Sequence, residues 1–151
     1  MRHIFCGEID NNYQAKGFHS NSYATNWRVC AVIQDCQTFP NLNGHCRDVF
    51  IYHLHDAYYE LKESDSTLWP ATLSPAQLVP MFQDLYNRCP PAIDNAVLCF
   101  PNCRWNGNNN RFDIVIGTGI DDITTAYPAR RGACRRHPNW QDCDTSDCQN
   151  L

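Results

Sequence analysis

The sequence lacks a long hydrophobic run, and its apolar stretches, such as residues 49–52, are short. A membrane-spanning helix needs about 20 predominantly apolar residues, so we expect no membrane partner. Met1-Arg2-His3 leads directly into polar sequence. We therefore expect that any secretory leader has already been removed.

A net positive charge is also missing, because 12 Lys and Arg face 16 Asp and Glu, which gives −4. This excludes a broad basic coat for nucleic acid but not an enzyme that grips a few phosphates locally. Basic charge is concentrated late in the chain, where residues 129–137 contain four arginines and no acid. The simplest interpretation of this cluster is a solvated tail.

Ten cysteines are present, but no two of them form the C-x2-C pair typical of a zinc knuckle. An even number at irregular spacing is typical of disulfides formed in an oxidising compartment. We therefore expect five disulfides, of unknown connectivity, in a secreted protein. The ten are Cys6, Cys30, Cys36, Cys46, Cys89, Cys99, Cys103, Cys134, Cys143 and Cys148.

One helix is predicted over Ser74–Arg88, with Ser74 as N-cap and Pro75 at the first helical position. Its apolar stripe has helical spacing, and Pro80 interrupts that stripe, so the regular helix could begin only there. The stripe consists of Leu78, Met81, Phe82 and Leu85.

β-Branched and aromatic residues predict four strands, and Asn106–Asn110 and Gly117–Gly119 read as turns. A length of 151 residues with 43% hydrophobic content suits one domain. The prediction is an α+β fold with an antiparallel sheet and one main helix. Residues 1–128 are expected to form the domain, and residues 129–151 a Cys- and Arg-rich tail tied to it. The strands are Arg47–Leu54, Asn95–Phe100, Phe112–Ile116 and Ile120–Tyr127.

Two histidines, His3 and His19, lie on either side of the turn-forming sequence Asp10-Asn11-Asn12. If the chain doubles back there, both imidazoles can face one site. An opposed pair suits phosphodiester transfer, because one ring takes a proton while the other gives one. Two ordinary surface histidines are the alternative. A second histidine pattern, His53-x-His55, is more often structural than metal-binding, and we expect no metal and no cofactor.

The segments around these histidines, His3-Ile4-Phe5-Cys6-Gly7-Glu8-Ile9 and Gly17-Phe18-His19-Ser20, resemble the EndoU ribonuclease family, especially its bacterial and toxin-type branch. The resemblance continues in family order through residues 66–74 and through 106–128, which ends in Thr124-Thr125-Ala126-Tyr127-Pro128. It implies an EndoU-like (RNase A-like) domain. The implied activity is endonucleolytic cleavage of RNA beside uridine, leaving a 2′,3′-cyclic phosphate.

By this resemblance His19 is the base that takes the 2′-hydroxyl proton, and His3 is the acid that protonates the leaving oxygen. The Gly17 amide would help to bind the charged phosphorane. Thr125 and Tyr127 would complete the catalytic site and line the nucleotide pocket.

The sequence departs from the family pattern at the third catalytic residue, which in many members is a lysine ahead of the middle helix. Only two lysines exist, Lys16 and Lys62, and Lys62 aligns only with a gap. Without the gap Asp65 stands there, which would repel phosphate. Either Lys62 completes the site, or Thr125, Tyr127 and backbone donors stabilise the charge.

The leading hypothesis is a secreted, monomeric ribonuclease with an RNA substrate. A toxin or defence role would imply an immunity or inhibitor protein as partner. The alternative is a non-enzymatic, secreted, disulfide-rich binding or inhibitor protein, which the acidic composition and the displaced lysine favour. Cleavage of a uridine-containing oligoribonucleotide distinguishes the two.

Overall fold

The computed structural model describes residues 2–38, 44–53, 57–104, 111–143 and 148. The chain forms two compact units, residues 1–75 and 76–151, and each is taken separately. No helix in the described residues is long and apolar enough to cross a membrane. The predicted division at residue 128 stays a prediction.

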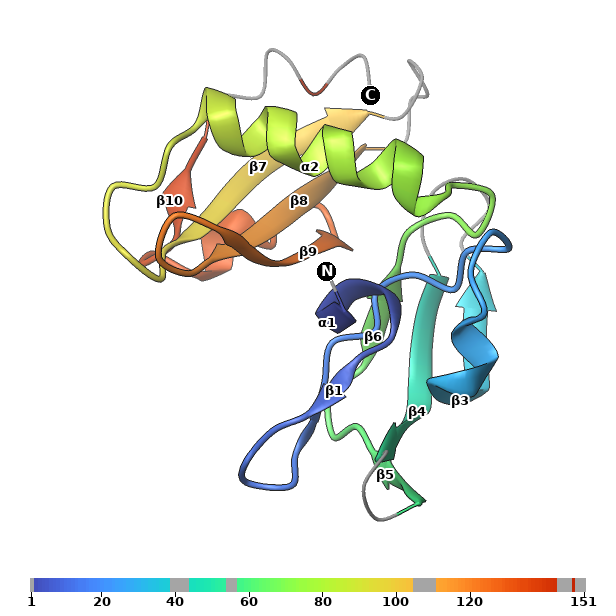
Figure 1. Cartoon of the computed structure of the whole chain (residues 1–151). Helices are drawn as coiled ribbons and strands as arrows, with labels where there is room; N and C mark the ends of the chain where they lie inside the picture. The colour runs from blue at the N-terminus through green and yellow to red at the C-terminus, as the bar shows by residue number, and fades with distance from the viewer. Residues whose placement is uncertain (1, 39–43, 54–56, 105–110, 144–147, 149–151) are drawn as a thin grey trace. The chain divides into compact units, whose positions relative to one another are not determined.

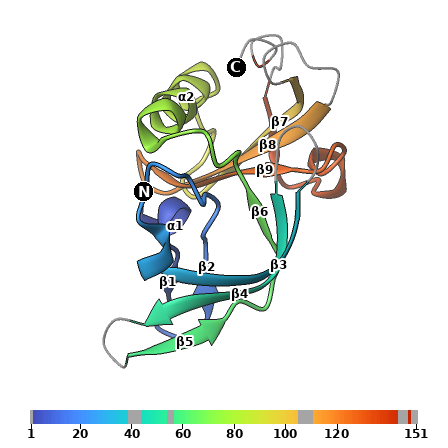
Figure 2. The ribbon, with the colours of Figure 1, turned by 90° about the vertical axis from the view of Figure 1, so that its right-hand side faces the viewer.

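The first unit begins with α1 (Arg2–Phe5), followed by the short antiparallel pair β1 (Glu8–Ile9) and β2 (Ala15–Lys16). Next come a 3₁₀ turn, η1 (Trp27–Val29), and a sheet of order β3–β4–β5, in which β6 also pairs with β4. All these pairs are antiparallel, and Figure 2 shows β3, β4 and β5 side by side. The sheet strands are β3 (Ala31–Thr38), β4 (Gly44–His53), β5 (Tyr58–Leu61) and β6 (Ser66–Leu68).

Small and β-branched side chains of this unit form a core around Phe18. Val49 and Ile51 contribute from β4, where they alternate with more exposed residues as expected for a strand with one buried face. The disulfide Cys6–Cys30 ties the N-terminal segment to the residue before β3, and Cys36–Cys46 cross-links β3 to β4.

The second unit contains the main helix, α2 (Pro75–Arg88), and a four-stranded sheet of order β10–β7–β8–β9. Figures 1 and 2 show α2 lying along one face of this sheet, and its stripe of Leu78, Phe82 and Leu85 is buried. The strands are β7 (Val97–Arg104), β8 (Arg111–Thr118), β9 (Ile123–Ala129) and β10 (Gln141–Asp142).

Pro80 lies inside α2 and does not delay its start to residue 80. The amide that Pro80 lacks would have bonded to the carbonyl of residue 76, four residues earlier and within the first turn. Only one hydrogen bond near the helix end is lost, so Pro75 remains the first helical residue.

The predicted α+β class with antiparallel sheets and one main helix is confirmed, and all ten cysteines are paired. Residues 129–151 contain more structure than the expected tail, namely a 3₁₀ turn, η2 (Cys134–Arg136), and β10, which pairs in parallel with β7. The disulfides Cys89–Cys143, Cys99–Cys134 and Cys103–Cys148 fasten this segment to the second unit. The turn predicted at 106–110 lies outside the described residues.

Candidate active site

His3 lies in the single turn of α1, beside the fully buried Ile4. The amides of Cys6 and Gly7 donate to the carbonyl of Arg2, 2.8 and 3.0 Å away, and close this turn. A segment this close to a chain end would otherwise fray. The Cys6–Cys30 disulfide and the buried Ile4 therefore fix the position of His3.

His19 is brought to α1 by direct backbone hydrogen bonds. The Phe18 amide donates to the carbonyl of His3 at 2.7 Å, and the His19 amide donates to that of Ile4 at 2.6 Å. The carbonyl of His19 in turn accepts from the Trp69 amide at 2.9 Å. The predicted doubling back therefore occurs, and it aligns the two histidine segments residue by residue.

Gly17 makes this close approach possible. Its φ is +77°, and a Cβ there would collide with the carbonyl of His3 and lie 2.9 Å from two of its ring carbons. Only glycine meets both requirements without strain. The structure therefore gives Gly17 a definite role in holding His3, whereas its predicted amide contact with substrate stays a prediction.

The two rings lie with centroids 6.0 Å apart and planes inclined by 35°. His3 Nδ1 donates to the Glu8 carboxylate at 2.8 Å, and His19 Nδ1 donates to the carbonyl of Thr67 at 3.1 Å. Because Nδ1 of each ring already donates to an acceptor, Nε2 is the nitrogen that remains to take or give a proton. With Nδ1 donating to the Thr67 carbonyl, a neutral His19 carries its lone pair on Nε2.

The protonation state of His19 follows from its surroundings. Burial, first, and the nearby charge of Lys62, second, lower the pKa of His19 to about 3, with a smaller contribution from His3 and an opposing one from the Thr67 carbonyl. At neutral pH the His19 ring is therefore uncharged, and its predicted role as the base stays a prediction. The family resemblance assigned the base role to His19, whereas burial beside Lys62 as the cause of its low pKa could not be predicted from the sequence.

Lys62 is the residue whose placement the sequence left open, and the structure puts its ammonium group close to His19. It is 7% exposed and donates to the Ser66 hydroxyl at 2.7 Å and to the carbonyl of Asp65 at 3.4 Å. The Ser66 hydroxyl donates to the carbonyl of Gly17 at 3.4 Å. Burial lowers the pKa of Lys62 to about 8, although Asp65 opposes that shift.

Thr125 and Tyr127 lie in the second unit, on β9, opposite Gly117 and Val115 of β8. The Thr125 hydroxyl is buried and has no hydrogen-bond partner in the described part of the chain. The ring of Tyr127 packs against a cluster that includes Cys99, and burial raises its pKa. That both residues line the same site as the histidines stays a prediction.

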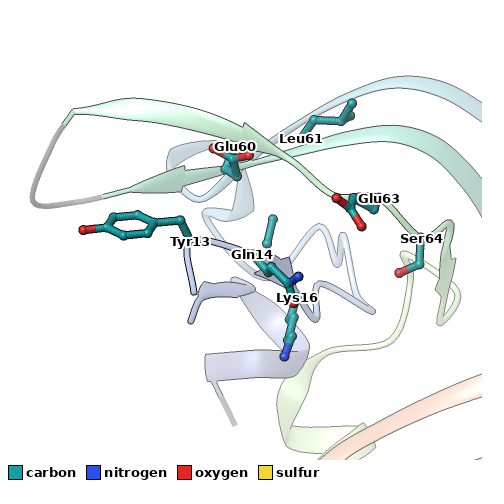
Figure 3. Close-up of a pocket in the computed structure, with 8 residues that line it drawn as sticks. Tyr13, Gln14, Lys16, Glu60, Leu61, Glu63 and Ser64 are labelled. Atoms are coloured by element: carbon teal, nitrogen blue, oxygen red, sulfur yellow. The ribbon is translucent and has the colours of Figure 1, made fainter. Parts of the chain in front are cut away.

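A surface pocket of about 190 Å³ lies between the hairpin that carries Lys16 and β5 with the chain that follows it. Figure 3 shows Glu60, Glu63 and Ser64 along one side and Tyr13 to Lys16 along the other. Lys16 forms an ion pair with Asp10 at 2.6 Å. The pocket is lined by neither histidine, and its two glutamates disfavour a phosphate ligand.

One cluster has the geometry of a metal site, because a sulfur of Cys99, one of Cys134 and an oxygen of Asp113 lie within 4.8 Å of one another. Its chemistry does not fit, since the two sulfurs form a disulfide. The Asp113 carboxylate accepts three backbone amides, at 3.0 to 3.1 Å. Of the predicted alternative, His53-x-His55, the second histidine lies outside the described residues.

We predict that Gly17→Ala displaces His3 and lowers RNA cleavage about 100-fold, because small misplacements of a catalytic group carry penalties of that size. Gly132→Ala is the matched control. Gly132 also has a positive φ, +91°, but a Cβ there would meet no atom within 4 Å. Cleavage of a dinucleotide and melting temperature are measured on both variants. Equal activity of the two would show that the contact with His3 is unimportant.

We also predict an acid-sensitive stability that depends on His19. The pKa of His19 falls from an ordinary 6.5 to about 3 on folding. Between these pH values, His19 therefore carries a proton in the unfolded chain but not in the folded chain. The stabilisation is complete above pH 6.5 and is lost as pH falls towards 3, by up to about 1.4 kcal/mol per pH unit.

Denaturant unfolding of the wild type and of His19→Gln from pH 7 to pH 3.5 checks this prediction. Subtracting one stability curve from the other removes the contribution of the carboxylates. The wild type should lose stability faster than the variant as the solution is acidified. Parallel curves would mean that the pKa of His19 is not lowered on folding, and would contradict the prediction.

A family model described as "Bacterial EndoU nuclease" matches residues 1–130. No curated protein matches the chain, and no solved structure matches it. The matched range contains His3, His19, Lys62 and β9, and it covers most of the 151 residues. With its paired histidines in place, the chain belongs to the bacterial EndoU nuclease family.

Proposed function

We propose that the protein is a secreted endoribonuclease that cleaves single-stranded RNA by transesterification. The observation that carries the proposal is the pair of histidine rings 6.0 Å apart, one on a carboxylate and the other on a carbonyl. The lowered pKa of His19 keeps that ring neutral, while the Glu8 carboxylate orients the His3 ring. General acid–base catalysis of phosphodiester transfer needs both forms at the same pH.

In the proposed reaction His19 Nε2 takes the proton from the ribose 2′-hydroxyl, and the resulting oxygen attacks phosphorus. The bond from phosphorus to the 5′-oxygen breaks, and His3 Nε2 gives its proton to that leaving oxygen. The products are a 2′,3′-cyclic phosphate and a 5′-hydroxyl. The protonated Lys62 stabilises the additional negative charge of the phosphorane, as a preorganised cation does in a site that excludes water.

A preference for uridine rests on the family resemblance and on Thr125 and Tyr127. The unpaired Thr125 hydroxyl could bond a base edge or a phosphate oxygen, and the ring of Tyr127 could stack on the nucleotide. Secretion is supported by five disulfides, which persist in oxidising compartments. We also propose a role as a toxin or defence effector, with an immunity protein as its partner.

The experiment uses an oligoribonucleotide that contains one uridine, together with a copy that carries 2′-deoxyuridine at that position. We expect the first to be cut beside the uridine and the second to stay intact, because it lacks the nucleophile. Cleavage of both would exclude attack by the 2′-hydroxyl. Cleavage of neither would favour the non-enzymatic binding protein.

A further prediction concerns Tyr127. Replacing it with alanine should lower cleavage tenfold to a hundredfold, because one stacked base contributes about 1–3 kcal/mol. Tyr127→Phe, which keeps the ring and its packing, should retain most of the activity and the full melting temperature. If both variants cleave like the wild type, Tyr127 is only a core residue. If Tyr127→Ala lowers the melting temperature in proportion to its loss of activity, Tyr127 is likewise only a core residue.

A further inference from the structure

A strongly basic, exposed loop follows β9 and begins at residue 130, the last residue of the family match. Arg130, Arg131, Arg135, Arg136 and His137 are all exposed. The stretch contains no acid, although the rest of the chain is acidic. We call residues 130–137 the arginine loop.

The arginine loop is held rigidly, unlike a solvated tail. Cys134 is joined to Cys99 of β7 by a disulfide. The amides of Gly132 and Cys134 donate to one oxygen of the buried Asp113 at 3.1 and 3.0 Å. Because the backbone is already ordered, a ligand that binds the arginines loses no binding free energy to ordering it.

Within the described residues, the positive charges of the loop are not neutralised by the groups that pack against it. Asp113 is the acid that contacts the loop, but its two oxygens accept backbone amides from Asn102, Gly132 and Cys134. Arg131 donates to the Asn102 amide oxygen at 3.1 Å, which is uncharged. In the described residues no ion pair joins a carboxylate to any arginine of the loop.

An aromatic pair ends the loop. The ring of His137 stacks on Trp140 with centroids 3.9 Å apart and planes inclined by 14°. Trp140 packs against the buried cluster that contains Cys134, which fixes the position of this pair. Guanidinium groups beside a fixed aromatic pair are the combination that binds a single-stranded nucleic acid, through its phosphates and its bases.

We infer that the arginine loop is an RNA-binding surface that grips backbone phosphates of the substrate. This inference rests on the proposed function, to which it adds a second contact region on longer RNA. Four arginines and no lysine favour phosphate, because the planar guanidinium pairs with it bidentately. A membrane surface is less well matched, since no large aliphatic side chain accompanies the arginines of residues 130–137.

The binding test compares two full-length double variants in a His19→Ala background, in which cleavage is expected to be slow. The first is Arg135→Gln with Arg136→Gln. The control is Arg28→Gln with Arg88→Gln, which removes the same formal charge from exposed positions elsewhere, where Arg88 pairs with Asp84 and Arg28 lies over the Trp27 ring. Affinity for a labelled 20-nucleotide RNA is measured from 50 to 300 mM salt.

We expect the loop variant to bind about tenfold more weakly in 0.1 M salt than the control. Its plot of log affinity against log salt should be shallower by about 1.4, at roughly 0.7 for each lost phosphate contact on a single strand. Equal affinity and equal slopes in the two variants would overturn the inference, because the arginines would then act only through net charge.

Cleavage by the same variants with His19 restored separates this inference from the proposed function. The loop variant should show a raised KM on the long RNA and an unchanged kcat/KM on a uridine dinucleotide. If the wild type cleaves neither substrate, the proposed function fails, whereas the binding data still decide the inference. If the loop variant instead loses binding to anionic phospholipid vesicles and keeps its affinity for RNA, the surface is not for RNA.

Discussion

Replacing His19 with alanine is expected to reduce RNA cleavage by a factor of about 10² to 10⁴, the usual contribution of one general base. The reason is the environment of the ring, in which burial and Lys62 keep it neutral and the Thr67 carbonyl fixes its Nδ1 proton. His3→Ala should lose a similar factor. Single-turnover cleavage of a uridine dinucleotide measures both.

His53→Ala is the matched control, because His53 lies on β4 and stacks on Tyr58, 5.1 Å away. It should keep its activity within about threefold. The double variant of His3 and His19 should lose little more than the worse single variant, since residues that act as a unit are not additive. Full activity in His19→Ala would contradict the mechanism.

Lys62→Met is expected to lower kcat by about 10² to 10³, the usual effect of removing one electrostatic stabiliser of a transition state. Methionine preserves much of the apolar stem and removes only the charge. The substitution also relieves a buried ammonium group, so the melting temperature should not fall in proportion to activity. Steady-state kinetics and thermal unfolding of the same variant separate the two effects.

Lys16→Met is its control, because Lys16 is the other lysine of the chain and pairs with Asp10. It should retain activity within a few fold. Since the pKa of Lys62 is lowered to about 8, wild-type activity should decline above pH 8 as the charge is lost. A Lys62→Met variant with wild-type kcat would leave charge stabilisation to Thr125, Tyr127 and backbone donors.

Much of the fold could be predicted where periodicity is strong. The stripe of α2 and the alternation in β8 and β9 identified those elements within a few residues. Strand β3 was missed, since Gln34 and Asp35 interrupt its apolar pattern, and β10 was missed because two residues carry no periodicity. Disulfide connectivity depends on which strands meet, which local sequence does not determine.

The candidate site was predictable as far as local chain geometry determines it. The turn between His3 and His19 implied that the rings could meet, and their centroids lie 6.0 Å apart. Lys62 could not be placed by counting positions, because its contact with Ser66 depends on how β5 leads into β6. The neutral state of His19 is a consequence of burial in the folded chain.

The most direct test of the central claim is the mass of the RNA ends formed when the wild-type protein cuts an oligoribonucleotide containing one uridine. Transfer to the 2′-oxygen predicts a 5′ fragment that ends in a 2′,3′-cyclic phosphate and a 3′ fragment that begins with a 5′-hydroxyl. A 3′-hydroxyl on the first fragment and a 5′-phosphate on the second would show that water was the nucleophile, and would contradict the roles proposed for His19 and His3.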